Sequence, residues 1–150
     1  MTENGLTSGW FQGATHVLPL RVYWEDTDGT GVVYYANYLK YAERARTDLL
    51  RLSGIEQSML LAEGRLMFAV RYCEVDYFAP ARLDDEFEVH TRLTEIRGAS
   101  LQAEQIVRRD GVDLVRTRVK VACLDPAGRP MRLPTALRDS LTALLRSEHI

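Results

Sequence analysis

Residues 23–38, YWEDTDGTGVVYYANY, combine side chains that could take part in acyl transfer. Glu25, Asp26 and Asp28 lie within four positions, and two glycines and an apolar, aromatic run follow them. An unpaired carboxylate is strongly penalised when it is buried, so a core strand would avoid this density of acids. A solvated loop would not need such apolar neighbours. The pattern therefore indicates a functional site.

A carboxylate beside the start of a helix is a minimal catalytic set for acyl transfer. Gly29 and Gly31 allow a tight turn with positive φ, and the unpaired N–H groups at the start of the following helix suit a developing oxyanion. One well-placed donor of this type typically contributes about a hundred- to a thousandfold in rate. From the pattern alone, a purely structural role for Asp26 or Asp28 in the turn is equally compatible.

Histidine and cysteine chemistry finds less support in the sequence. A Ser-His-Asp or Cys-His mechanism needs a histidine base. His16 lies near the N-terminus, His149 is next to last, and His90 falls on the polar face of an expected strand, where it should be solvated. Cys73 and Cys123 lie in strand-like runs without metal-spaced companions, so we interpret both as core thiols.

The sequence DTDGTG, which starts at Asp26, partly matches the start of a calcium-binding loop. The match then fails, because Thr30 occupies the fifth position and Asn37 occupies the twelfth, where a bidentate Glu is needed. Neither nucleotide motif, GxxxxGK[ST] or GxGxxG, is present. We therefore expect no metal site and no cofactor.

Length, composition and charge indicate one globular domain. The chain has 150 residues, of which 46% are hydrophobic and 27% charged, and its formal net charge of −2 does not favour nucleic acid as a partner. Residues 1–16 contain Glu3 and no continuous apolar core, so we predict a flexible leader instead of a secretory signal, with the domain over residues 17–150. No apolar run is long enough to span a membrane, so we expect a soluble, cytoplasmic protein.

The elements that would position the acidic turn follow from hydrophobic periodicity. Residues 17–23, VLPLRVY, contain Pro19 and predict either an edge strand or a short strand that begins just after the proline. From Asn37, apolar residues recur at steps of three and four as far as Leu52, and Ser53-Gly54 marks the end of a helix of roughly sixteen residues. A second, shorter helix is expected over residues 55–62.

The second half of the chain predicts mainly strands. DEFEVHTRLTEI, residues 85–96, alternates apolar and polar side chains, as in a half-buried antiparallel strand. Residues 101–124 predict two strands joined at Asp110-Gly111, which is a strong hairpin signal. A final helix can start at Pro134, with an apolar stripe made by Leu137, Leu141, Leu144 and Leu145. The order is one strand, a long helix and about four strands, which predicts an α+β domain with a helix laid against an antiparallel sheet.

The segment RVYWEDTDGTGVVYYANYLKYAERART, residues 21–47, resembles the signature of hot-dog-fold acyl-CoA thioesterases of the 4-hydroxybenzoyl-CoA thioesterase type. Residues 76–107 and 121–134 resemble the matching segments of the branch named for the Tol-Pal envelope system. The resemblance covers nearly the whole chain except the leader. It implies a hot-dog fold, in which the sheet wraps one long central helix. It also implies a homodimer or homotetramer, with sites at the interface of two subunits that join edge to edge.

The resemblance also assigns roles in the site. The second acid of the D-x-D pair is Asp28, which would attack the thioester carbonyl or activate water for that attack. The backbone N–H of Tyr35 would bind the thioester oxygen, and Gly31 and Val32 would shape the turn between them. The Tol-Pal branch commonly has histidine where this chain has Tyr35, whereas the 4-hydroxybenzoyl type has tyrosine.

Coenzyme A contacts are implied near EIRGAS, at Arg97 and Ser100, since a guanidinium suits phosphate geometry. Glu43 is a rival acid, because another hot-dog branch carries its catalytic carboxylate on the central helix. Here Arg44 and Arg46 are close along the helix, and we expect Glu43 to form an ordinary surface pair with Arg46.

The predicted function is hydrolysis of an acyl-CoA to a carboxylate and free coenzyme A. The alternative is a non-hydrolytic module that binds acyl-CoA or acyl carrier protein at the cell envelope. A hot-dog dehydratase is a weaker alternative, because it generally needs a histidine that the sequence does not place in the site. Acyl carrier protein as a partner and a peripheral association with the inner membrane both stay open, and the sequence does not disclose the acyl length.

Overall fold

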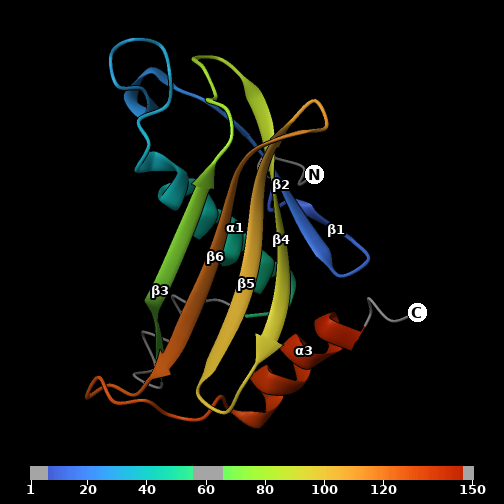
Figure 1. Ribbon diagram of the computed structural model, residues 1–150. Helices are drawn as coiled ribbons and strands as arrows, with labels where there is room; N and C mark the ends of the chain where they lie inside the picture. The colour runs from blue at the N-terminus through green and yellow to red at the C-terminus, as the bar shows by residue number, and fades with distance from the viewer. Residues whose placement is uncertain (1–6, 56–65, 147–150) are drawn as a thin grey trace.

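The computed structural model describes residues 7–55 and 66–146, which form one antiparallel sheet with a long helix across one of its faces (Figure 1). The six strands in this part of the chain are ordered β1-β2-β4-β5-β6-β3. The fold is therefore α+β, as predicted. Its elements are β1 (Trp10–Gln12), β2 (Thr15–Arg21), the 3-10 turn η1 (Trp24–Asp26), α1 (Asn37–Leu52), β3 (Met67–Tyr77), β4 (Glu86–Ile96), β5 (Ser100–Arg109), β6 (Val112–Leu124) and α3 (Thr135–Arg146).

The helix α1 has the 16 residues that the periodicity predicts. It ends where Gly54 adopts a φ of +85°, a conformation that glycine takes at little cost. Ala42 and Ala45 are at most 1% exposed, and their small side chains allow the sheet to approach the helix axis. Leu52, which was expected to face the core, is instead 43% exposed. No helix in residues 7–55 or 66–146 is long and apolar enough to cross a membrane.

The hairpin between β5 and β6 is confirmed. Asp110 and Gly111 have φ of +51° and +77°, and Arg109 pairs with Val112 across the turn. Two consecutive residues with positive φ match the right-handed twist of the flanking strands. The alternation in β4 is also confirmed, because its predicted apolar face is buried. His90 lies on the other face, but it is not solvated as expected, since its side chain is 14% exposed and bonds to Glu88 at 3.0 Å.

The N-terminal boundary of the domain requires a correction. Residues 10–12 fall in the predicted leader but form β1, in which Trp10 pairs with Val17 of β2. Gly9 permits the close return of the chain, since a Cβ at this position would lie 2.0 Å from the Val17 carbonyl oxygen. A three-residue strand is too short to show a periodic pattern. Residues 1–6 and nearly all of the helix predicted at 55–62 lie outside the described residues.

The final helix agrees with the sequence prediction, whereas one of the two cysteines does not. α3 begins directly after Pro134, and Leu141 on its inner side is fully buried. Cys123 is buried, as predicted, but Cys73 is exposed. Cys73 lies on β3, which is the last strand of the sheet in residues 7–55 and 66–146 and pairs there with β6 alone, so it is covered less than the central strands.

A row of buried polar side chains crosses the sheet on the side that faces α1. His16, Thr91, Gln105 and Thr117 are neighbours in register on β2, β4, β5 and β6, and each is at most 1% exposed. The row separates two apolar clusters, one near the start of α1 and one near its end. Buried polar groups need partners, so this row constrains the packing of helix on sheet.

Gln105 makes three of the hydrogen bonds of this row, whereas Thr117 Oγ1 has no partner in the described residues. Its Nε2 donates to the Ala42 carbonyl of α1 at 2.8 Å and to Thr91 Oγ1 at 2.9 Å, and its Oε1 accepts a bond from Arg46 Nη1 at 2.9 Å. Arg46, which was expected to pair with Glu43 on the helix surface, therefore turns inward. The middle of α1 is tied to the centre of the sheet by one amide side chain.

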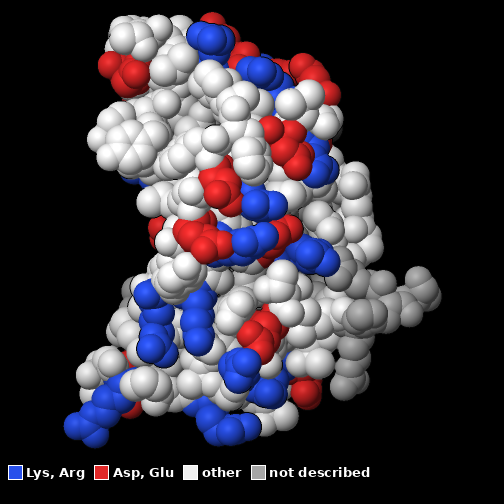
Figure 2. Space-filling model, viewed as in Figure 1, with Lys and Arg blue, Asp and Glu red and all other residues white. Residues whose placement is uncertain are grey.

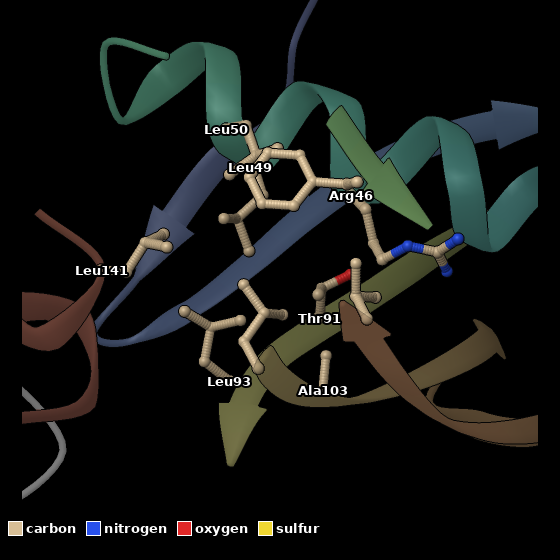
Figure 3. A pocket seen from close by; sticks show the side chains of 10 residues that line it. Arg46, Leu49, Leu50, Thr91, Leu93, Ala103 and Leu141 are labelled. Carbon is tan, nitrogen blue, oxygen red and sulfur yellow. The ribbon is translucent and has the colours of Figure 1, made fainter. Parts of the chain in front are cut away.

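A small apolar cavity lies beyond the polar row, between the C-terminal half of α1, β4, β5 and α3 (Figure 3). Its volume is about 50 Å³, enough for a few water-sized groups. In Figure 3 the leucines Leu49, Leu93 and Leu141 gather on one side of the view, while the Arg46 guanidinium extends away from them. The cavity lies in the apolar cluster near the end of α1, whereas Asp28 precedes its start.

Candidate active site

The acidic segment between β2 and α1 divides into structural and exposed acids. Asp26 is 8% exposed, and its Oδ2 accepts a bond from the Tyr23 N–H at 2.9 Å. Its carbonyl accepts bonds from the Tyr34 N–H at 2.9 Å and from Asn37 Nδ2 at 2.8 Å. Asp26 therefore holds the segment together, as expected of a turn residue, and Glu25 is exposed to solvent.

Asp28 lies at the start of a turn that contains two glycines. Gly29 and Gly31 have φ of +90° and +94°, a region that glycine occupies far more readily than other residues. The Asp28 N–H donates to the Val32 carbonyl at 3.0 Å, and Val32 in turn forms a β-bridge with Arg82. Gly31 and Val32 therefore lie in the same turn as Asp28.

The Asp28 carboxylate is exposed but is bonded on one side. Its Oδ1 accepts bonds from the Thr30 hydroxyl at 2.5 Å and from the Thr30 N–H at 2.8 Å. These two hydrogen bonds, the one from the hydroxyl first, hold the pKa of the Asp28 carboxyl below its usual value. The group is therefore a carboxylate at neutral pH. Its second oxygen, Oδ2, accepts no hydrogen bond from the described residues.

The chain enters α1 through a turn that leaves two backbone donors open. The Tyr34 carbonyl accepts a bond from the Asn37 N–H at 2.8 Å, and the Tyr35 carbonyl accepts one from the Tyr77 hydroxyl at 2.9 Å. Within the described residues, the N–H groups of Tyr35 and Ala36 have no acceptor. Open N–H groups at a helix start carry partial positive charge and suit an oxyanion.

The residues expected to contact coenzyme A lie at the turn between β4 and β5. Arg97 Nε pairs with Glu95 Oε1 at 2.7 Å, and the Arg97 N–H donates to the Ser100 carbonyl at 2.8 Å. Ser100 is 8% exposed. The Arg97 carbonyl accepts a bond from Arg138 Nη1 of α3 at 2.8 Å, so α3 supports this turn.

Further arginines gather at this turn. Arg132 lies over Gly98, with its Nη1 3.3 Å from the position that a Cβ would occupy there. Figure 2 shows lysine and arginine side chains concentrated toward the lower end of the molecule, where Figure 1 places the β4–β5 turn and α3. Sequence reasoning missed Arg132 and Arg138, because their spacing in the chain follows no recognisable pattern.

The two parts of the expected site are far apart within one copy of the chain. The Leu83 N–H donates to the Gly31 carbonyl, which places the start of β4 beside the Asp28 turn. The 11 residues of β4 then run roughly 35 Å to Arg97 at the opposite end. One copy therefore holds Asp28, Gly31, Val32 and Tyr35 in one segment before α1, whereas Arg97 and Ser100 lie at the far end of β4.

An antiparallel sheet that wraps one long helix is the arrangement of the hot-dog fold. The chain belongs to the thioesterase-like superfamily, whose family model matches residues 22–141.

Individual relatives agree with this assignment. The chain is 46% identical over 121 residues to the acyl-CoA thioester hydrolase YbgC of Escherichia coli O6:H1, a match that covers 79% of this chain and 90% of the relative. A probable thioesterase of Bartonella henselae superposes with a TM-score of 0.77 at 37% identity, covering 80% of this chain and 99% of the other. A thioesterase of Thermus thermophilus complexed with coenzyme A and Zn superposes with a TM-score of 0.74 at 31% identity, covering 89% and 97%.

Proposed function

We propose that this chain hydrolyses acyl-CoA thioesters and that Asp28 is the carboxylate that reacts. The activity follows from its relatives, which include a named acyl-CoA thioester hydrolase at 46% identity over most of the chain. The role of Asp28 rests on one observation. An ionised carboxylate with an open oxygen stands in the same segment as the two open N–H groups of Tyr35 and Ala36.

In the reaction, the thioester carbonyl oxygen accepts bonds from the open N–H groups, which stabilise the negative charge that develops on it. Asp28 then attacks the carbonyl carbon, the carbon–sulfur bond breaks, and coenzyme A leaves as a thiolate that takes up a proton. Water hydrolyses the resulting anhydride to the free acid and restores Asp28. In the alternative route Asp28 takes a proton from the attacking water.

The lowered pKa of Asp28 keeps its carboxylate ionised at neutral pH, which both the nucleophilic and the general-base route require. The Thr30 bonds occupy Oδ1, so Oδ2 is the oxygen available for attack.

We further propose that a second copy of the chain supplies Arg97 and Ser100 to the site. The separation of roughly 35 Å along β4 supports this, because one copy cannot place both groups on one substrate carbonyl and its coenzyme A. Among the described strands, β3 pairs on one side only and offers a free edge for a partner. We propose that the protein forms a homodimer or homotetramer and acts in the cytoplasm. Acyl carrier protein is proposed as another acyl donor.

The test is thiol release from a panel of short, long and aromatic acyl-CoAs. Asp28→Asn should lower kcat by at least about a hundredfold, since it removes the reacting carboxylate. Glu43→Gln, an acid exposed on α1, is the matched control and should retain native turnover. Full activity of Asp28→Asn with loss in Glu43→Gln would move the reacting acid to α1. Binding of every thioester without turnover would favour a non-hydrolytic acyl-CoA module.

A further inference from the structure

Tyr77, the last residue of β3, contacts the turn that carries the two open N–H groups. Its hydroxyl donates to the Tyr35 carbonyl at 2.9 Å, a bond between residues 42 positions apart. Its ring meets the Tyr35 ring edge-on, with centroids 6.3 Å apart, and the Tyr38 ring at 5.8 Å. The turn is thus attached to the sheet by a side chain outside the acidic segment.

Because the peptide bond is planar, a hydrogen bond to a carbonyl oxygen also fixes the orientation of the next N–H group. In a trans peptide the C=O of one residue and the N–H of the next point in opposite directions within one plane. The bond from Asn37 to the Tyr34 carbonyl therefore sets the direction of the Tyr35 N–H. The bond from Tyr77 to the Tyr35 carbonyl sets the direction of the Ala36 N–H in the same way.

The end of β3 is itself held firmly. Tyr77 pairs with Val115 of β6, and the next two N–H groups, of Phe78 and Ala79, both donate to the Leu114 carbonyl, at 2.8 and 3.1 Å. Partial desolvation raises the pKa of Tyr77, although the residue is 48% exposed, so its hydroxyl is a protonated donor throughout the neutral range. The donor is thus positioned by the sheet and not by the turn on which it acts.

We infer that Tyr77 is a positioning residue for the oxyanion site, and that its hydroxyl holds the peptide between Tyr35 and Ala36 so that both open N–H groups converge on the thioester oxygen. The inference rests on the proposed function in one respect, that these N–H groups bind the oxyanion. It adds the Ala36 N–H as a second donor and a residue of β3 as its support.

The test compares Tyr77→Phe with Tyr72→Phe. Both changes remove one hydroxyl from an exposed tyrosine of β3, and among the described residues the Tyr72 hydroxyl bonds to the surface carboxylate Glu74 alone, at 2.9 Å. In Tyr77→Phe, kcat should fall about three- to tenfold, the loss expected for one neutral hydrogen bond, with KM within twofold and the melting temperature lowered by no more than about 4 °C. Tyr72→Phe should match the native protein in all three.

A second measurement does not depend on turnover. Backbone amide NMR should show new microsecond-to-millisecond exchange at Tyr35 and Ala36 in Tyr77→Phe, and none in Tyr72→Phe. Native kcat and native amide signals in Tyr77→Phe, beside an inactive Asp28→Asn, would overturn the inference and leave the proposed function standing. A lower kcat with mobile amides in Tyr77→Phe, beside an active Asp28→Asn, would instead keep the inference and remove Asp28 from its role.

Discussion

Thr30 donates two hydrogen bonds to a single oxygen of Asp28, one from its hydroxyl and one from its backbone N–H. Residue 30 follows the first glycine of the turn and precedes the second, so both donors are fixed by the same backbone geometry. The arrangement stabilises the carboxylate and leaves its other oxygen open.

Thr30→Val should move the acid limb of the pH–rate profile upward. The native pKa of Asp28 is lowered, so the carboxylate persists, and activity is lost only as the pH falls below the ordinary value of 3.8. Without the hydroxyl bond the pKa rises, and kcat/KM begins to fall at a higher pH while its value at pH 7 is retained. Brief pH-jump assays measure this. Thr27→Val is the control, because its hydroxyl donates to the Trp24 carbonyl and accepts a long bond of 3.4 Å from the Gly29 N–H, but does not contact the Asp28 carboxylate. An equal shift in both variants would contradict the assignment.

Asp28→Asn and Arg97→Ala should complement each other when they are co-expressed. If each site takes its acid from one copy and its arginine from the other, a mixed dimer contains one fully native site and one doubly defective site. With random pairing, half of the dimers are mixed, and one of the two sites in each mixed dimer is native. About a quarter of native activity is therefore restored. Thiol release by the purified mixture measures this. Activity no higher than the average of the two separate variants would place both residues in one copy's site.

Acidification should destabilise the fold through His16. Its side chain is fully buried, Nε2 bonds to the Ser8 carbonyl at 2.7 Å, and Nδ1 is buried without a partner in the described residues. Burial lowers the pKa below 6.5, although the Ser8 bond and the Asp48 charge oppose it. The unfolded chain then binds the proton more readily, so the free energy of unfolding is greatest above about pH 6.5 and decreases below it until the folded pKa is reached.

Urea unfolding at pH 7.5 and pH 5 checks this prediction. His16→Gln should lose most of the decrease between the two pH values, whatever its overall stability. His90→Gln, which changes a half-buried histidine on the other face of the sheet, should retain it. A native-like decrease in His16→Gln would assign the effect to other groups.

Gln105→Leu should lower the free energy of unfolding by about 2–4 kcal/mol. The change leaves the Thr91 hydroxyl and the largely buried Arg46 guanidinium without their partner, and each such loss costs about 1–3 kcal/mol. Gln102→Leu, on the opposite face of β5, should change it by less than about 0.5 kcal/mol. Equal midpoints in urea for Gln105→Leu and the native protein would show that the buried row contributes nothing to stability.

The elements that the sequence predicted well depend on neighbours along the chain. The 3.6-residue period defines α1, and Asp110-Gly111 defines the β5–β6 hairpin, because each signal lies within a few residues. The position of β3 at the sheet edge depends on pairing across the whole fold. The strand-like run around Cys73 therefore could not reveal that Cys73 would be exposed.

The site also contains residues that a local pattern could predict and residues that depend on contacts across the fold. Asp28, Gly31, Val32 and Tyr35 belong to one short segment, so a local pattern could bring them together. Tyr77 reaches the turn from another strand, and no spacing in the sequence indicates that contact. The inward turn of Arg46 was missed for the same reason, since its partner Gln105 lies 59 positions away.

The separation of Asp28 from Arg97 along β4 has a genetic consequence. In a dimer with shared sites, one chain that carries both Asp28→Asn and Arg97→Ala would remove the reacting carboxylate from one site. It would also remove the arginine that contacts the coenzyme A phosphate from the other. Its native partner would then have no intact site to use. Such an allele would act as a dominant negative in a cell that also expresses the native protein, although each of its two changes alone spares one site of every mixed dimer.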